Sequence, residues 1–252
     1  PHIITESGRV VAAYHSVVVT DIREVQGEES LESFEGVDFS KPPEGSHKSI
    51  CEMHYILKNM SHKNYSEFYH DAVEHQEDLF TLFNLGYLTL KERALAEELY
   101  HRICQRALSF AKEEKYLIED FDKLLEEKAS KYLANFSIFQ SIPDAWAINQ
   151  LFPVLPLSNH NKKTTRQATI VDITCDSDGC VDQFIDRKFQ KKTIDLHGPS
   201  GKPYYIGFFL VGAYQESLSN EHNLFGAINE VEVIVDSDGE WKIDKITPGD
   251  PV

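Results

Sequence analysis

The strongest constraint on the fold is a change in the spacing of hydrophobic residues along the chain. Leu95, Leu99, Ile103 and Ala107 recur at four-residue intervals, which is the spacing of one face of an α-helix. The segment Thr89-Leu90-Lys91-Glu92 before them has the Thr and Glu of a capping box. Neighbouring helices are predicted around Phe80, Phe83, Leu124, Leu125, Tyr132 and Leu133. Several antiparallel helices, forming an inserted helical bundle, are therefore expected at residues 49–142.

After Pro143 the pattern changes to short runs of β-branched and aromatic residues bounded by Gly, Pro and Asp. These runs lie at residues 168–173, 193–196, 204–211, 231–235 and 241–246. Asp236-Ser237-Asp238-Gly239 between the last two predicts a hairpin turn. An antiparallel sheet or small barrel is expected at residues 143–252.

The first part of the chain has a different pattern. Val17-Val18-Val19, followed by Ile22 and Val25, predicts a buried strand within residues 1–26, preceded by a turn and joined by a short helix. Residues 27–48 contain six acidic residues, three glycines and Pro42-Pro43, which is typical of an exposed acidic linker. The chain begins with Pro and lacks the features of a signal peptide at residues 1–5, so we expect a longer polypeptide.

Charge and cysteine spacing exclude several classes of protein. The net charge of -16 and the pI near 5.1 argue against a nucleic-acid partner. No apolar run approaches the roughly 18 residues of a membrane span, so we expect a soluble chain with no membrane partner. Cys51, Cys104, Cys175 and Cys180 form no CxxC pair, which argues against a zinc site or a disulfide framework and favours reduced thiols in the cytoplasm.

Three short clusters at the ends of predicted elements are the candidates for chemistry, because loops at strand ends carry most binding residues. They are Glu6-Ser7-Gly8-Arg9, Cys175-Asp176-Ser177-Asp178-Gly179 and Gly212-Ala213-Tyr214. Each taken alone is more often a turn, a solvated charge or a packing residue.

In this order, however, the clusters resemble the carboxyl-terminal half of the fold-type III decarboxylases, and most closely the biosynthetic arginine decarboxylases. The resemblance covers nearly the whole chain. It rests on the segments at residues 4–9, 135–146, 172–179, 207–216 and 222–226, which read ITESGR, NFSIFQSIPDAW, DITCDSDG, GFFLVGAYQE and HNLFG.

The resemblance implies an α+β fold: the end of a (β/α)8 barrel that binds pyridoxal 5'-phosphate at residues 1–26, then the linker and the inserted bundle, then an incomplete carboxyl-terminal antiparallel β-barrel or sandwich. Ornithine and diaminopimelate decarboxylases lack such an insertion, so the insertion favours arginine. The resemblance also implies that the cofactor-binding lysine lies upstream, so the chain alone is expected to be inactive.

The same resemblance implies roles for individual residues. Glu6 would pair with the cofactor's pyridinium, while the Gly8 amide, Arg9 and Tyr214 would hold its phosphate. Cys175 would return a proton to the substrate α-carbon after CO2 leaves. Asp176, assisted by Asp178, would bind the guanidinium, although Asp178 is interpreted mainly as a turn residue.

Other residues have no assigned role. Cys51, Cys104 and Cys180 are interpreted as structural. His222 and Asn223 are interpreted as a turn, and no metal ligand is predicted, although the resemblance allows Mg²⁺.

The activity implied is decarboxylation of L-arginine to agmatine and CO2 in polyamine and spermidine biosynthesis. The implied assembly is a homodimer, or a dimer of dimers, in which neighbouring subunits share each active site. Two alternatives remain open: a sister decarboxylase of another diamino acid, and an inactive regulatory homologue of a decarboxylase.

Overall fold

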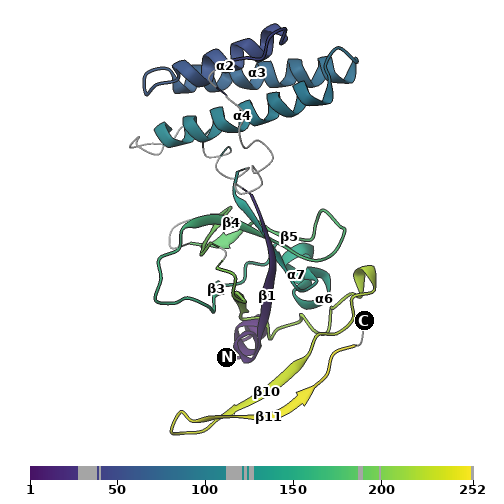
Figure 1. The fold of residues 1–252 in the computed structure, drawn as a ribbon. Coiled ribbons are helices and arrows are strands. Elements are labelled where there is room, and N and C mark those ends of the chain that lie inside the picture. Colours follow the sequence, from purple (N-terminus) through teal and green to yellow (C-terminus); the bar gives the residue numbers. More distant parts are fainter. Residues whose placement is uncertain are drawn as a thin grey trace. The chain divides into compact units, whose positions relative to one another are not determined.

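The computed structural model describes residues 1–27, 39, 41–111, 121, 124, 128–186, 190–198 and 200–250. The chain forms two compact units (Figure 1). The sheet unit comprises Pro1–Ser30 and Ala129–Val252, and the helical unit comprises Leu31–Lys128.

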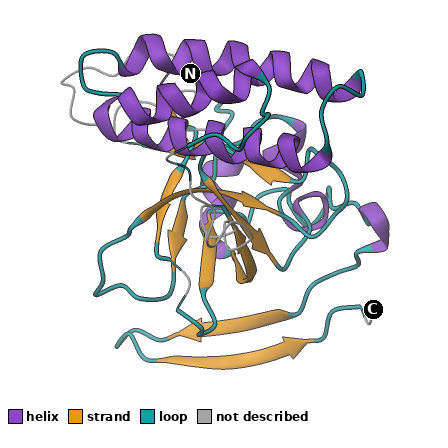
Figure 2. Ribbon diagram, turned by 45° about the horizontal axis from the view of Figure 1, so that its top comes forward, coloured by secondary structure: helices purple, strands orange, loops and turns teal. Residues whose placement is uncertain are grey.

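The helical unit contains three described helices that pack on one another (Figure 2). They are α2 (Lys48–Asn59), α3 (Tyr65–Asn84) and α4 (Leu90–Ala111). The residues predicted from four-residue spacing, Leu95, Leu99, Ile103 and Ala107, are all buried in α4. They share one hydrophobic core with Met53 and other residues of α2 and α3, so the predicted bundle is confirmed for this part of the chain.

The capping box at the start of α4 is also confirmed. The Thr89 backbone N–H donates to Glu92 Oε2 at 2.8 Å, and the Glu92 N–H donates back to Thr89 Oγ1 at 3.3 Å. These bonds satisfy amides that the first helical turn would otherwise leave unpaired.

The sheet unit is built on a curled, half-barrel sheet of seven strands in the order β3-β9-β1-β2-β4-β5, with β8 also paired to β4. Its strands are β1 (Val17–Gln26), β2 (Ser130–Ala134), β3 (Val154–Pro156), β4 (Arg166–Val171), β5 (Cys180–Val181), β8 (Ile194–Leu196) and β9 (Tyr205–Phe209). A separate small pair joins β6 (Phe184–Ile185) to β7 (Gln190–Lys191). Short helices precede and connect the strands: α1 (Gly8–Ala12), η1 (Ala13–His15), α6 (Ile138–Ser141) and α7 (Pro143–Ala147).

The sheet differs from the expected one in its membership. The described strand pairs within residues 143–252 are antiparallel, as predicted. The sheet also includes β2, which precedes these residues and pairs with β4 in parallel, with Tyr132 opposite Ile170. β1 lies inside this sheet, between β9 and β2, so residues from both ends of the chain build one core.

The predicted helix at Tyr132 and Leu133 was wrong. Both residues lie in β2, where Ser130, Tyr132 and Ala134 are buried and the intervening side chains are not. This is the two-residue period of a strand rather than the period of a helix. Leu125 lies outside the described residues.

The first strand is only half buried. Of its three consecutive valines Val18 is buried, whereas Val17 and Val19 are 44% and 53% exposed. Most of the predicted linker at residues 27–48 lies outside the described residues, and Lys48 is the first residue of α2.

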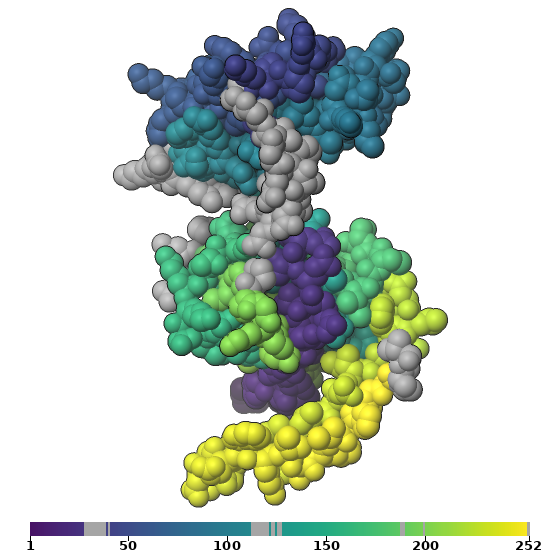
Figure 3. Space-filling view, viewed as in Figure 1, coloured from purple at the N-terminus to yellow at the C-terminus, as the bar shows by residue number. Residues whose placement is uncertain are grey.

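The last two strands, β10 (Glu230–Val235) and β11 (Trp241–Thr247), form a separate antiparallel hairpin, yellow in Figure 3. The predicted turn between them is confirmed. Asp236 Oδ1 accepts hydrogen bonds from the N–H groups of Asp238 and Glu240, and Gly239 has a φ of +83°. Within the described part of the chain, no helix is long and apolar enough to cross a membrane.

Candidate active site

Helix α1 begins within the Glu6-Ser7-Gly8-Arg9 segment and places Arg9 against α7. The Arg9 Nη2 group donates to Asp144 Oδ2 at 2.6 Å, and the Arg9 guanidinium lies 5.0 Å from the centre of the Tyr214 ring. We call Gly8, Arg9, Asp144, Tyr214 and Gln215 the arginine cluster.

Asp144 holds this cluster together from a buried position. Its side chain is only 6% exposed. Gln215 Nε2 donates to Asp144 Oδ2 at 2.8 Å, while the Asp144 N–H donates to Gln215 Oε1 at 3.1 Å. Because both groups of the Gln215 amide engage Asp144, the carboxylate that orients Arg9 cannot turn away without breaking several bonds.

The arginine cluster has features of an anion site. Arg9 Nη1 is buried and has no hydrogen-bond partner among the described residues. A Cβ atom at Gly8 would lie 2.9 Å from the Tyr214 hydroxyl oxygen, so glycine allows this hydroxyl to approach the backbone closely. Tyr214 itself has a φ of +72°, an uncommon value for a non-glycine residue. A free guanidinium N–H, a tyrosine hydroxyl and a bare backbone are groups that suit a phosphate, so the residues fit the phosphate of pyridoxal 5'-phosphate.

Glu6 lies just before this cluster and is exposed. The structure gives it no hydrogen bond to another described residue. Its predicted role toward the cofactor ring is therefore not tested by the geometry of this chain.

The loop at residues 172–180, which we call the cysteine loop, is shaped by Asp172. This carboxylate is buried and accepts hydrogen bonds from the Thr174 N–H at 2.8 Å, the Thr174 hydroxyl at 2.7 Å and the Ile138 N–H at 2.9 Å. The Asp172 N–H donates to the Gly179 carbonyl at 2.8 Å, which closes the loop. A Cβ at Gly179 would overlap the Asp172 and Thr174 side chains, so this closure needs glycine.

Cys175 is exposed at the tip of this loop. Its Sγ atom lies 3.5 Å from Asn223 Nδ2 and 3.7 Å from Asn223 Oδ1. Asn223 was interpreted as a turn residue, and in the structure its side-chain amide also contacts the Cys175 thiol.

Asp176 and Asp178 lie in one turn of the cysteine loop. The Asp178 N–H donates to Asp176 Oδ1 at 2.9 Å, so the carboxylate that forms the turn is Asp176. Asp178 lies in this turn, as interpreted, because the Gly179 N–H donates to the Asp176 carbonyl at 3.0 Å across it. The Asp178 Oδ2 atom accepts from Trp146 Nε1 at 3.1 Å. Asp176 Oδ2 lies 3.1 Å from His222 Nε2, and both side chains are about one-third exposed.

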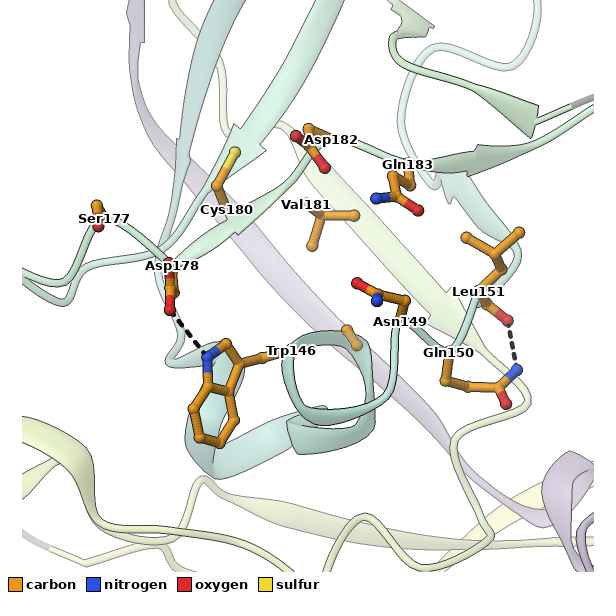
Figure 4. Close-up of a pocket in the computed structure, with 11 residues that line it drawn as sticks. Trp146, Asn149, Gln150, Leu151, Ser177, Asp178, Cys180, Val181, Asp182 and Gln183 are labelled. Atoms are coloured by element: carbon orange, nitrogen blue, oxygen red, sulfur yellow. Dashed lines mark hydrogen bonds between the residues drawn. The ribbon is translucent and has the colours of Figure 1, made fainter.

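A cavity of about 310 Å³ lies on the Trp146 side of the loop (Figure 4). Its polar lining includes Asn149, Asp178 and Asp182, together with Cys180. Burial, and to a lesser extent the charge of Asp182, raise the pKa of Cys180 to about 11. The thiol of Cys180 is thus protonated near neutral pH, in keeping with the structural interpretation of this cysteine.

A second cavity, of about 410 Å³, lies beside the start of the final hairpin and includes Asp21, Asn135 and Asp250 in its lining. Neither cavity includes Cys175 or Arg9 in its lining. Among the described residues, no hydrogen bond or ion pair joins the arginine cluster directly to Cys175, Asp176 or Asp178. Both sets of residues instead contact α7, through Asp144 and Trp146 respectively.

Sequence reasoning gave no role to Asp144, Gln215, His222 or Asn223. All four lie inside the segments that carry the resemblance. The available signal for Gln215 was its position directly after Tyr214, whereas the other three are polar residues in segments where no residue was given a role.

Comparison with known proteins agrees with the resemblance along the chain. Residues 43–125 match the family described as the arginine decarboxylase helical bundle domain. The biosynthetic arginine decarboxylase of Deinococcus radiodurans is 44% identical over 99% of this chain and 37% of its own length. That of Phocaeicola vulgatus is 41% identical over 100% of this chain and 39% of its own length.

The chain is thus similar to the biosynthetic arginine decarboxylases along nearly its whole length. The crystal structure of the biosynthetic arginine decarboxylase from Campylobacter jejuni supports this at the level of fold, with a TM-score of 0.78 and 34% identity over 96% of this chain and 37% of that one. The chain spans between 36% and 40% of the length of the curated relatives that it matches.

Proposed function

We propose that this chain is the carboxyl-terminal part of an arginine decarboxylase that depends on pyridoxal 5'-phosphate and converts L-arginine to agmatine and CO2. The observation that carries the proposal is the pairing of an exposed thiol, Cys175, with an adjacent carboxylate, Asp176, on a loop held rigid by a buried aspartate. The similarity to arginine decarboxylases over nearly the whole chain supports the choice of reaction.

The arginine cluster is the proposed site for the cofactor phosphate. The Gly8 backbone, the unpaired Nη1 of Arg9 and the Tyr214 hydroxyl would bind it, with Asp144 orienting Arg9. Glu6 would face the pyridine nitrogen. When bound, the cofactor supplies an electron sink for the electron pair that CO2 leaves behind.

Cys175 is the proposed general acid. Its thiol would give a proton to the substrate α-carbon, and the S–H electron pair would remain on sulfur as the new C–H bond forms. Exposure of the side chain at a loop tip supports this role, because the group must reach a bound substrate.

Asp176 is the proposed partner of the substrate's guanidinium. Its Oδ1 is used for the turn and its Oδ2 contacts His222, yet each carboxylate oxygen can accept more than one hydrogen bond. Asp178 would assist by its charge while bound to Trp146.

We propose that residues 1–26 end a (β/α)8 barrel, that residues 49–142 are an insertion, and that residues 143–252 belong to a carboxyl-terminal β-domain. The resemblance supports a homodimer or larger oligomer in which each site combines two subunits. The resemblance supports a role in polyamine and spermidine synthesis, and the spacing of the four cysteines supports reduced thiols in the cytoplasm. Mg²⁺ rests on the resemblance alone, and the described residues hold no group of three or more His, Cys, Asp or Glu that could bind a metal ion.

The test is steady-state kinetics of the enzyme that contains this chain. L-arginine should be decarboxylated in preference to L-ornithine, L-lysine and meso-diaminopimelate. Preference for another of these substrates would favour a sister decarboxylase, and no activity on any would favour a regulatory homologue.

Asp176→Asn and Asp178→Asn form a matched pair, because each keeps its side-chain shape and an acceptor oxygen while losing its charge. Loss of a charge-assisted contact in a partly desolvated site costs about 2–5 kcal/mol, or roughly 30-fold or more in kcat/KM. We expect this loss in Asp176→Asn. A larger loss in Asp178→Asn would move the guanidinium to that carboxylate.

A further inference from the structure

The short turn η3 (His222–Leu224) contacts both functional side chains of the cysteine loop. His222 Nε2 lies 3.1 Å from Asp176 Oδ2, and the Asn223 amide lies beside Cys175 Sγ. Asn223 Oδ1 also accepts from the Cys175 backbone N–H at 3.4 Å. One amide side chain therefore engages the backbone and the sulfur of the same cysteine.

The backbone conformation of η3 positions Asn223 for its contact with Cys175. Asn223 has a φ of 56° and a ψ of 23°, in the left-handed region, and Leu224 follows with a φ of 65°. Asparagine is among the non-glycine residues that adopt this conformation at lowest cost. The turn is fixed to α6, since the His222 ring lies 4.4 Å from the Phe139 ring and the Asn220 N–H donates to the Phe139 carbonyl.

We propose that Asn223 is a positioning residue for the Cys175 thiol, a role that rests on the proposed function of Cys175 as general acid. A free cysteine side chain samples three staggered rotamers. The two contacts from one amide select a single rotamer and direct the S–H group to one place.

The same contact serves the thiol after it has given up its proton. Proton transfer forms a C–H bond at the substrate α-carbon and leaves the electron pair of the S–H bond on Sγ. Asn223 Nδ2–H then has a charged acceptor 3.5 Å away, and a hydrogen bond to a charged group is stronger than one to a neutral group. His222 meanwhile holds the Asp176 carboxylate, with His222 Nε2 3.1 Å from Asp176 Oδ2.

The chain provides a matched pair of variants to test this. Asn223→Gly and Leu224→Gly each remove a side chain from a left-handed residue, where glycine is well tolerated. Only Asn223 touches Cys175, whereas the Leu224 side chain is 91% exposed. A loss of stability that both variants share therefore comes from the change in the backbone of the turn and not from the contact with Cys175.

The first readout requires neither cofactor nor activity. Selective isotope labelling of the four cysteines, with Cys175→Ser to assign the signal, gives the Hα–Hβ couplings of Cys175 in the 252-residue chain. We expect one large and one small coupling in the parent and in Leu224→Gly, and nearly equal couplings in Asn223→Gly. Unequal couplings that persist in Asn223→Gly would overturn the inference whatever the activity.

The second readout is turnover of the enzyme that contains this chain. Spreading the thiol over three rotamers should lower kcat in Asn223→Gly roughly three- to tenfold. KM for arginine should stay within about twofold, because substrate contacts are kept. Leu224→Gly should keep the parent kcat. Couplings that become equal with an unchanged kcat would support the positioning contact and count against Cys175 as the general acid, which separates the failure of one idea from that of the other.

Discussion

Cys175 and Cys180 lie five residues apart in one loop but in different surroundings. Cys175 is exposed, whereas burial and Asp182 raise the pKa of Cys180 to about 11. At pH 8 roughly one Cys180 thiol in a thousand is then a thiolate, the form that reacts with alkylating agents. Reactivity should therefore separate these two cysteines clearly.

Brief treatment with iodoacetamide at pH 8 should modify Cys175 at least about tenfold faster than Cys180 or the fully buried Cys104. Peptide mass spectrometry measures each rate. The difference between the alkylation rates of Cys175 and Cys180 should become smaller as the pH approaches 11. Asp182→Asn should speed modification of Cys180, because it removes a negative charge. Equal rates for Cys175 and Cys180 at pH 8 would contradict the assignment of Cys175 as the accessible thiol.

For single residues, the sequence predicted which residues lie together better than it predicted the hydrogen bonds that they make. Gly8, Arg9 and Tyr214 were expected together and lie together, because the order of motifs carries that information. Asp178 was predicted to lie in the turn and does so, but the hydrogen bond from its N–H to the Asp176 carboxylate depends on backbone geometry and was not predicted. The repeated Asp-Ser-Asp-Gly at residues 236–239, where the first Asp accepts the hydrogen bonds, shows the same arrangement.

Elements with a local signal were predicted well. The capping box and four-residue spacing of α4 depend on residues within two turns of one another, so they can be read from a short window. β2 could not be read in this way. Its alternation is set by β1 and β4, which are remote in sequence, and its burial becomes visible only once those strands are paired.

The cap of α4 predicts a pH-dependent stability. The Thr89 backbone N–H, followed by the Thr89 hydroxyl, lowers the pKa of Glu92 below its ordinary 4.5. A carboxylate with a depressed pKa in the folded state stabilises the fold fully above its unfolded value and loses that contribution as the pH falls through the folded value. The contribution of the Glu92 charge should therefore be complete at pH 7 and be lost as the pH falls through the lowered pKa of the folded state.

Denaturant unfolding of Glu92→Gln and Thr89→Ala at pH 7, 5 and 3.5 measures this. Glu92→Gln should be about 0.3–1 kcal/mol less stable than the parent at pH 7, because charge is lost near a helix N-terminus, and equal to it at low pH. Thr89→Ala should lose about 1 kcal/mol at pH 7 through removal of the cap. A deficit of Glu92→Gln that is as large at pH 3.5 as at pH 7 would rule out the ionised cap.

At the scale of the whole molecule, each unit has a core of its own. Leu99 and Ile103 pack among the helices, while Tyr132, Ile170 and Phe208 pack within the sheet unit. The sequence predicted the helical segment because its composition and period differ from those of its neighbours. It did not predict that β1 and β9, from opposite ends of the chain, are paired side by side, because such a pairing leaves no local pattern.

The register of β1 and β2 has a consequence for how the chain can be cut and rejoined. Gln26 lies opposite Lys131, and a Cβ at Gly27 would lie 3.0 Å from Ser130 Oγ. β1 and β2 thus pair like the two strands of a β-hairpin, and the helical unit lies between them in the sequence, where a hairpin would have its loop. Replacing residues 28–129 by Asn-Gly would restore an ordinary four-residue loop and relieve about 3 kcal/mol of loop-closure entropy. The shortened chain should keep the strand signal in circular dichroism, lose the helical one, and unfold cooperatively; failure to fold would mean that the sheet depends on its insertion.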